Sequence, residues 1–139
     1  ITIEEMNLKV FPVGTLLVSC SANLGRCAIV GKELITNQTF IGLVPNSKAD
    51  VEFFYYRMCF EEKVLNAMAT GTTITYLSRE QFEEYELLIP TNKKEQHAIA
   101  QLLSDFDGEI EKEKSKLKKH KLLKEGMMND LLTGKVRLV

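Results

Sequence analysis

The chain has 139 residues, 45% of them hydrophobic, which fits one modest folded domain with an appended element and excludes a disordered protein. Its net charge of −1 is unevenly spread: residues 1–92 carry 7 basic and 11 acidic side chains, and residues 93–139 carry 11 and 8. Neither part is basic enough to predict nucleic-acid binding from charge alone, and no apolar run is long enough to span a membrane.

Short apolar runs separated by turn residues predict strands in the first third of the chain. Residues 15–20 and 27–30 flank a polar, glycine-containing loop, so they predict a hairpin-like unit. Residues 34–36 form another short apolar piece. Residues 40–44 predict a further strand, which Pro45 ends.

The apolar period then changes to that of a helix. Residues 50–68 predict one amphipathic helix, with Asp50 as its N-cap and Gly71 just past its end. Residues 72–77 are β-branched and aromatic, which favours extended structure. Ser78 and Gln81 have the spacing of a capping box that opens a short helix, and residues 86–90 predict a last strand stopped by proline.

A long helix is predicted from residue 93 to residue 132, since no proline interrupts it and Thr133 and Gly134 end it. Over about 35 residues at 1.5 Å each it would measure roughly 50 Å. Apolar residues spaced three and four apart share one side, and the other side is charged. So long a stripe cannot be buried on so small a domain, so we expect a partner helix in a coiled coil. The stripe consists of Ile99, Leu103, Phe106, Ile110, Leu117, Leu123, Met127 and Leu131.

Motifs for catalysis or metal binding are missing from the sequence. Glycine-rich phosphate loops are absent, and Asp50 with residues 61–63 is better read as a solvated helix face than as a nuclease site. His97 and His120 lie 23 residues apart and share no metal-binding turn. We therefore expect no catalytic residue, no metal and no resident cofactor.

The cysteines are read as strand residues and reduced thiols. Cys20 and Cys27 lack the second pair or the nearby histidine that a zinc site needs. An odd number of cysteines, three with Cys59, cannot form a closed disulfide framework, and with no signal peptide this composition indicates a cytoplasmic protein.

Polar loop residues are the candidate binding groups. Asn and Gln suit adenine edges, Arg suits guanine, and hydroxyls suit phosphates, so these loops are candidates for DNA contact. The alternative is that the same residue types stand there because they make turns. The candidates are Ser21, Asn23, Arg26, Asn37, Gln38, Thr72, Thr73, Tyr76 and Arg79.

Three stretches, taken in order, resemble the specificity subunit of type I restriction–modification enzymes, in its C-terminal half. They are residues 71–82 with the Leu-Ile-Pro at 88–90, residues 94–100 with Leu103 and Asp107 after them, and residues 123–137. The most specific parts are the Glu-Gln-x-x-Ile-Ala motif at 95–100 and the Leu-Leu-Thr-Gly-Lys-Val-Arg motif at 131–137. The resemblance covers nearly the whole chain.

The resemblance implies a non-catalytic protein that binds double-stranded DNA and reads one half of a split site. It implies spacer helices that pack antiparallel, either within one parent chain or between two copies. The modification subunits would bring the S-adenosylmethionine site, and the restriction subunit would bring the nuclease and the ATP- and magnesium-dependent translocase.

The expected fold is α+β: a small mixed β-sheet or partial barrel with short helices, followed by the coiled-coil spacer helix. Residues 1–92 would be the C-terminal part of a target-recognition domain, 93–132 the spacer and 133–139 an extended tail. We expect the chain to be the end of a longer protein, because it starts without an initiator methionine and lacks residues that a whole recognition domain needs. The alternative function is a coiled-coil dimerisation or protein-interaction module that does not bind DNA.

Overall fold

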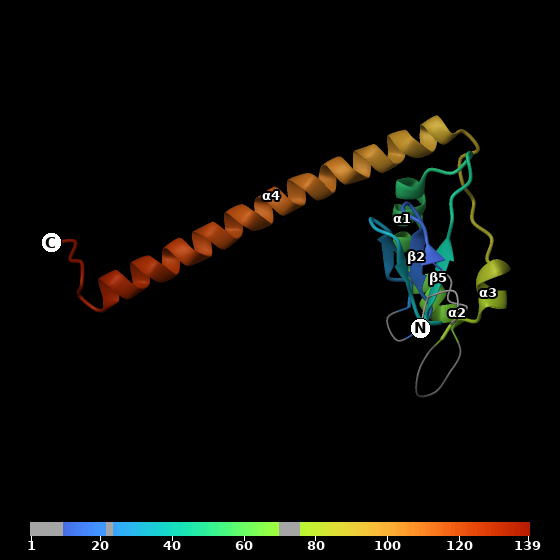
Figure 1. Ribbon diagram of the computed structural model, residues 1–139. Helices are drawn as coiled ribbons and strands as arrows, with labels where there is room; N and C mark the ends of the chain where they lie inside the picture. Colours follow the sequence, from blue (N-terminus) through green and yellow to red (C-terminus); the bar gives the residue numbers. More distant parts are fainter. Residues whose placement is uncertain (1–9, 22–23, 70–75) are drawn as a thin grey trace. The chain divides into compact units, whose positions relative to one another are not determined.

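The computed structural model describes residues 10–21, 24–69 and 76–139. They belong to two compact units, Ile1–Ala100 and Gln101–Val139. The described strands and short helices all lie in the first unit, and the second is formed by the larger part of the long helix with the residues after it (Figure 1).

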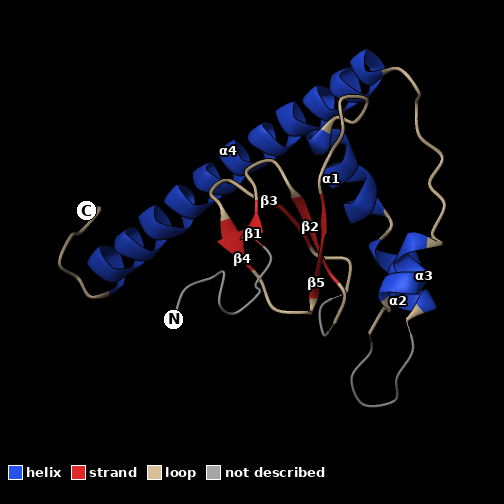
Figure 2. Cartoon of the chain, turned by 45° about the vertical axis from the view of Figure 1, so that its right-hand side comes forward, coloured by secondary structure: helices blue, strands red, loops and turns tan. Residues whose placement is uncertain are grey.

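Two small antiparallel sheets form the centre of the first unit (Figure 2). In one, β2 (Leu16–Ser19) lies between β3 (Cys27–Ile29) and β5 (Phe40–Leu43). In the other, β1 (Val10–Phe11) pairs with β4 (Leu34–Ile35). The predicted strands that correspond to β2, β3 and β5 are confirmed. β1 was not predicted, and β4 falls in the piece that the sequence marked only as short and apolar.

β2 is central because it is apolar on both faces. All four of its residues are buried, which explains the continuous rather than alternating pattern. Leu16 and Val18 face a core formed with Met58 and Leu65, and Leu17 faces the other way. On that second face Leu17 packs with Phe11 and Val30.

The helix predicted over residues 50–68 is wrong as one element. The structure has α1 (Val51–Phe60) and α2 (Glu62–Met68), separated at Glu61. The Asp50 N-cap is confirmed, because its carboxylate accepts a hydrogen bond from the Phe53 N–H at 3.0 Å. The expected Gly71 cap lies outside the described residues.

The break falls at Glu61, which is buried although the sequence placed it on a solvated face. This residue is 5% exposed. Its carboxylate is paired with Arg57 and accepts a hydrogen bond from the hydroxyl of Tyr85, 24 residues away. Its N–H bonds to the carbonyls of both Arg57 and Met58, at 3.2 and 3.1 Å, which tightens the last turn of α1.

The short helix α3 (Arg79–Glu83) begins at the predicted capping box. The Ser78 hydroxyl accepts from the Gln81 N–H at 3.2 Å, and the Gln81 side-chain oxygen accepts from the Ser78 N–H at 3.0 Å. The predicted strand over residues 86–90 is wrong, because these residues pair with no strand in the part of the chain that is described. Of the extended piece predicted over 72–77, only its last two residues are described.

The long helix is confirmed as α4 (Lys93–Leu132). Asn92 starts it, since its side-chain oxygen accepts from the Lys94 N–H at 2.9 Å. Gly134 follows its end with φ of 72°, a left-handed conformation in which glycine has no Cβ penalty.

Candidate functional site

Three loops that are distant in sequence meet at one end of β2. The Cys20 N–H donates to the Thr39 carbonyl at 2.8 Å, and the Leu77 N–H donates to the Cys20 carbonyl at 2.9 Å. Ser21 forms an isolated antiparallel bridge with Tyr76. The structure therefore gathers the polar loops around residues 19–21, 37–40 and 76–79 on one side of the sheet.

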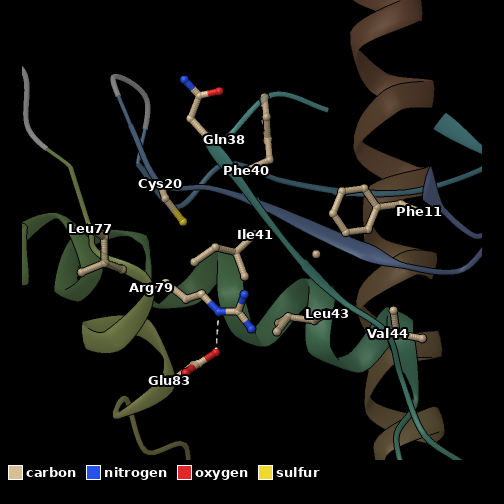
Figure 3. A pocket seen from close by; sticks show the side chains of 11 residues that line it. Phe11, Cys20, Gln38, Phe40, Ile41, Leu43, Val44, Leu77, Arg79 and Glu83 are labelled. Atoms are coloured by element: carbon tan, nitrogen blue, oxygen red, sulfur yellow. Dashed lines mark hydrogen bonds and ion pairs between the residues drawn. The ribbon is translucent and has the colours of Figure 1, made fainter. Parts of the chain in front are cut away.

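A groove of about 540 Å³ runs along β5, one of the two edge strands of the three-stranded sheet (Figure 3). Gln38 and Arg79, two of the predicted DNA-binding residues, both line it. Its floor is apolar, and Phe40 is 39% exposed at its rim. The full lining is Phe11, Cys20, Gln38, Phe40, Ile41, Gly42, Leu43, Val44, Leu77, Arg79 and Glu83.

The charged groups of this groove form one ion pair. The Arg79 Nε donates to the Glu83 Oε1 at 2.7 Å, as Figure 3 shows, and both side chains are more than half exposed. The hydrogen bond and the charge of Glu83 raise the pKa of Arg79, which stays cationic. Sequence reasoning missed Glu83, although its spacing of four residues from Arg79 on a helix is the signal that finds such pairs.

Two other predicted residues have local partners. The guanidinium of Arg26 lies 3.8 Å from the Glu62 carboxylate and does not line the groove. The Asn37 side-chain oxygen accepts hydrogen bonds from the backbone and hydroxyl of Thr39, so it makes a turn. Of these four predicted residues, only Gln38 and Arg79 line the groove.

Some of the remaining predicted DNA-binding residues are described by the structure and others are not. Tyr76 is 51% exposed, and Ser21 is partly buried with its carbonyl accepting from the Ser19 hydroxyl at 3.1 Å. Asn23, Thr72 and Thr73 lie outside the described residues.

Cys20, Cys27 and Cys59 are free thiols in the structure. Cys20 and Cys27 lie in or beside strands, as expected. Burial, together with the neighbouring Cys59, raises the pKa of Cys27 to about 12, and burial raises that of Cys20. Within residues 10–21, 24–69 and 76–139, no group of three His, Cys, Asp or Glu side chains is placed to hold a metal ion. None of the described helices is both long and apolar enough to cross a membrane.

α4 presents the predicted apolar stripe in the second unit. Its members from Leu103 to Met127 are between 38% and 61% exposed. Shallow apolar hollows lie among them, one at Phe106, Ile110 and Leu117 and another around Met127. Hollows between stripe residues are the receptors for side chains of a facing helix.

Some positions that a heptad repeat would add to the apolar stripe hold polar residues instead. Counting from Leu103 and Phe106 in sevens puts Glu113, His120 and Lys124 at seam positions. The sequence analysis did not place these three residues on the stripe. Polar seam residues cost stability but restrict the register and the partner of a coiled coil.

Comparisons with known proteins decide the family. The family model described as the type I restriction modification DNA specificity domain matches residues 2–119. The chain belongs to this family. The type I restriction enzyme MjaIX specificity subunit of Methanocaldococcus jannaschii is 34% identical over 116 residues, which are 81% of this chain and 26% of that protein.

Solved structures agree with the fold. The crystal structure of a type I restriction–modification S subunit from M. genitalium matches with a TM-score of 0.66 and 28% identity, over 88% of this chain and 33% of that one. A second structure, described as showing complex assembly and conformational transition of the type I system, matches with a TM-score of 0.74 at 17% identity, over 88% of this chain and 31% of that one. The predicted family and α+β fold class are confirmed, and the chain spans about a quarter to a third of these relatives.

Proposed function

We propose that this chain is the C-terminal portion of a type I specificity subunit that reads one half of a split DNA site. The observation that carries the proposal is the family match over residues 2–119, which takes in both the groove and most of α4. The relatives that match are themselves specificity subunits. A dimerisation module without DNA binding is the weaker candidate, because the match includes the β-rich unit as well as the helix.

In this proposal the loop end of β2 is the DNA-facing surface. Gln38 can donate to and accept from a base edge, and Arg79 can contact a base or a phosphate if Glu83 releases it. Tyr76 and Ser21 add exposed or partly exposed polar groups beside them. Because Glu83 already neutralises the charge of Arg79, we expect DNA contact through specific polar groups rather than through a broad cationic surface.

The protein has no catalysis of its own in this proposal. The modification subunits would bind S-adenosylmethionine and methylate the DNA, and the restriction subunit would bind ATP and magnesium. The stripe on α4 would pack on an antiparallel spacer helix, from the same parent chain or from a second copy. The complex would act in the cytoplasm.

The test is methylation by the full-length parent subunit assembled with its modification subunits. Gln38→Ala and Arg79→Ala should each relax the sequence that is methylated at one half-site, by about 1–3 kcal/mol of discrimination for a lost base contact. Lys63→Ala is the control, since Lys63 is exposed on α2 and does not line the groove.

Arg26→Ala and Asn37→Ala complete the set, and the structure predicts smaller effects for them. A complex that methylates the same sequences with the same selectivity in all four variants would refute this surface. A parent complex that binds DNA without any salt dependence would refute the proposed function as a whole.

A further inference from the structure

The start of α4 is held by one buried polar side chain, Gln96. Of the 40 residues of this helix, only Gln96 and Ala100 are buried, and Gln96 is 1% exposed. The Gln96 Oε1 accepts from the Asp50 N–H at 2.9 Å, and the Gln96 Nε2 donates to the Pro90 carbonyl at 2.8 Å. A buried carboxamide is tolerated only where both of its ends are paired, as they are here.

The two partners of Gln96 come from different elements of the first unit. Asp50 caps α1 through its Oδ1, and its Oδ2 lies 3.1 Å from the His97 Nδ1. Pro90 ends the extended segment that follows α3. One side chain therefore joins the beginning of α1, the end of that segment and the first turns of α4.

The other polar contacts at this place are more exposed. The Lys93 Nζ donates to the Ser47 carbonyl at 3.3 Å, near the outer limit for a hydrogen bond. The His97 side chain, which faces Asp50, is 63% exposed. Exposed contacts of this kind contribute little, whereas a buried group that loses its partners is costly. Among these polar contacts Gln96 is therefore the one whose loss should disturb the placement of these turns most.

We infer that Gln96 is a positioning residue, which holds the first turns of α4, from Lys93 to Ala100, in one orientation on the first unit. The consequence of this role rests on the proposed function. If the rest of α4 serves as a spacer, the spacing between the two DNA half-sites depends on how firmly these turns are held. Gln96 itself contacts no DNA in this inference and acts through Asp50 and Pro90.

Two measurements on the full-length subunit test the inference. The first is amide hydrogen exchange without DNA, in Gln96→Ala and in the parent protein. The amides from His97 to Ala100 should exchange faster in the variant, while those of β2 should exchange as before. Gln101→Ala is the matched control, because Gln101 is the same residue type on the same helix, is exposed, and donates along the helix to the Asp105 Oδ1 at 2.9 Å.

The second measurement is methylation of DNA in which the separation between half-sites is changed by one base pair. We expect the preference for the correct separation to fall about tenfold in Gln96→Ala, roughly the effect of losing one or two buried hydrogen bonds. The half-site sequences should stay the same, and Gln101→Ala should leave both properties unchanged.

Each outcome supports or overturns the inference. Unchanged exchange at residues 97–100 overturns the holding role, and faster exchange with an unchanged spacing preference overturns its consequence. If Gln96→Ala does not fold, Gln96→Met decides, because it keeps the length of the side chain and removes both hydrogen bonds. Loss of the fold in both variants also overturns the inference, since a residue that only positions α4 is not needed by β2 and β5. Exchange needs no DNA, so failure of the proposed function leaves that result standing.

Discussion

Gly42 is the position in the groove where one added methyl group should have the largest effect. A Cβ on this residue would lie 2.1 Å from the Phe11 Cε1 and 2.5 Å from its Cδ1. Contacts that short do not occur, so the Phe11 ring must move or β5 must shift. Phe11 is 7% exposed and packs with Leu17 and Val30, so displacement of its ring loses buried contacts in that cluster.

The expected cost of Gly42→Ala follows from what Phe11 would lose. Removing a buried phenylalanine costs about 3–5 kcal/mol, and partial displacement of its ring should cost somewhat less. Replacing glycine by alanine also lowers the entropy of the unfolded chain, which offsets about 0.4–1 kcal/mol of this cost. We therefore expect Gly42→Ala to lower the free energy of unfolding by about 2 kcal/mol, which corresponds to a fall of roughly 6–8 °C in Tm.

A double-mutant cycle measured by urea unfolding tests the cause. In a Phe11→Ala background the clash is absent, so Gly42→Ala should there be neutral or slightly stabilising. Gly31→Ala is the control, because nothing lies within 4 Å of a Cβ at that position. If Gly42→Ala costs as much without the Phe11 ring as with it, the steric explanation is refuted.

Three further predictions concern the helix stripe, a helix cap and a thiol. Phe106→Asp or Ile110→Asp should disrupt assembly with a partner helix and leave the β-rich unit folded, because both side chains are about half exposed on the stripe. A size-exclusion profile unchanged by either substitution would contradict this prediction. Ser78→Ala should lower stability by about 1 kcal/mol through loss of the capping box, which urea unfolding measures, and an unchanged midpoint would show that the box contributes nothing. Because the pKa of Cys27 is raised to about 12, its thiol should stay neutral and react slowly with iodoacetamide at pH 9 in the folded protein. The folded state should also lose stability as the pH rises from 9.0 towards 12, since the unfolded chain releases this proton first; rapid alkylation of folded Cys27 at pH 9 would contradict the raised pKa.

Local patterns in the sequence were sufficient for the elements that depend on neighbours along the chain. α4 was predictable because its period, its lack of proline and the ends marked by Asn92 and Gly134 are all local signals. The caps at Asp50 and Ser78 were predictable for the same reason, since each bonds to a backbone N–H three residues on. The family also followed from ordered motifs, because these are properties of the sequence itself.

Partners far apart in the sequence decided the rest. Glu61, where α1 and α2 separate, is buried through a contact with Tyr85, 24 residues away. Residues 86–90 are no strand because no strand pairs with them in the described part of the chain. Gln96 looks like any polar helix residue until Asp50 and Pro90 are seen to bond to it. Periodicity shows which side of a helix or strand is apolar, but it does not show what covers that side. Only the packing of the chain decides which polar groups are buried and which loops meet to form the groove.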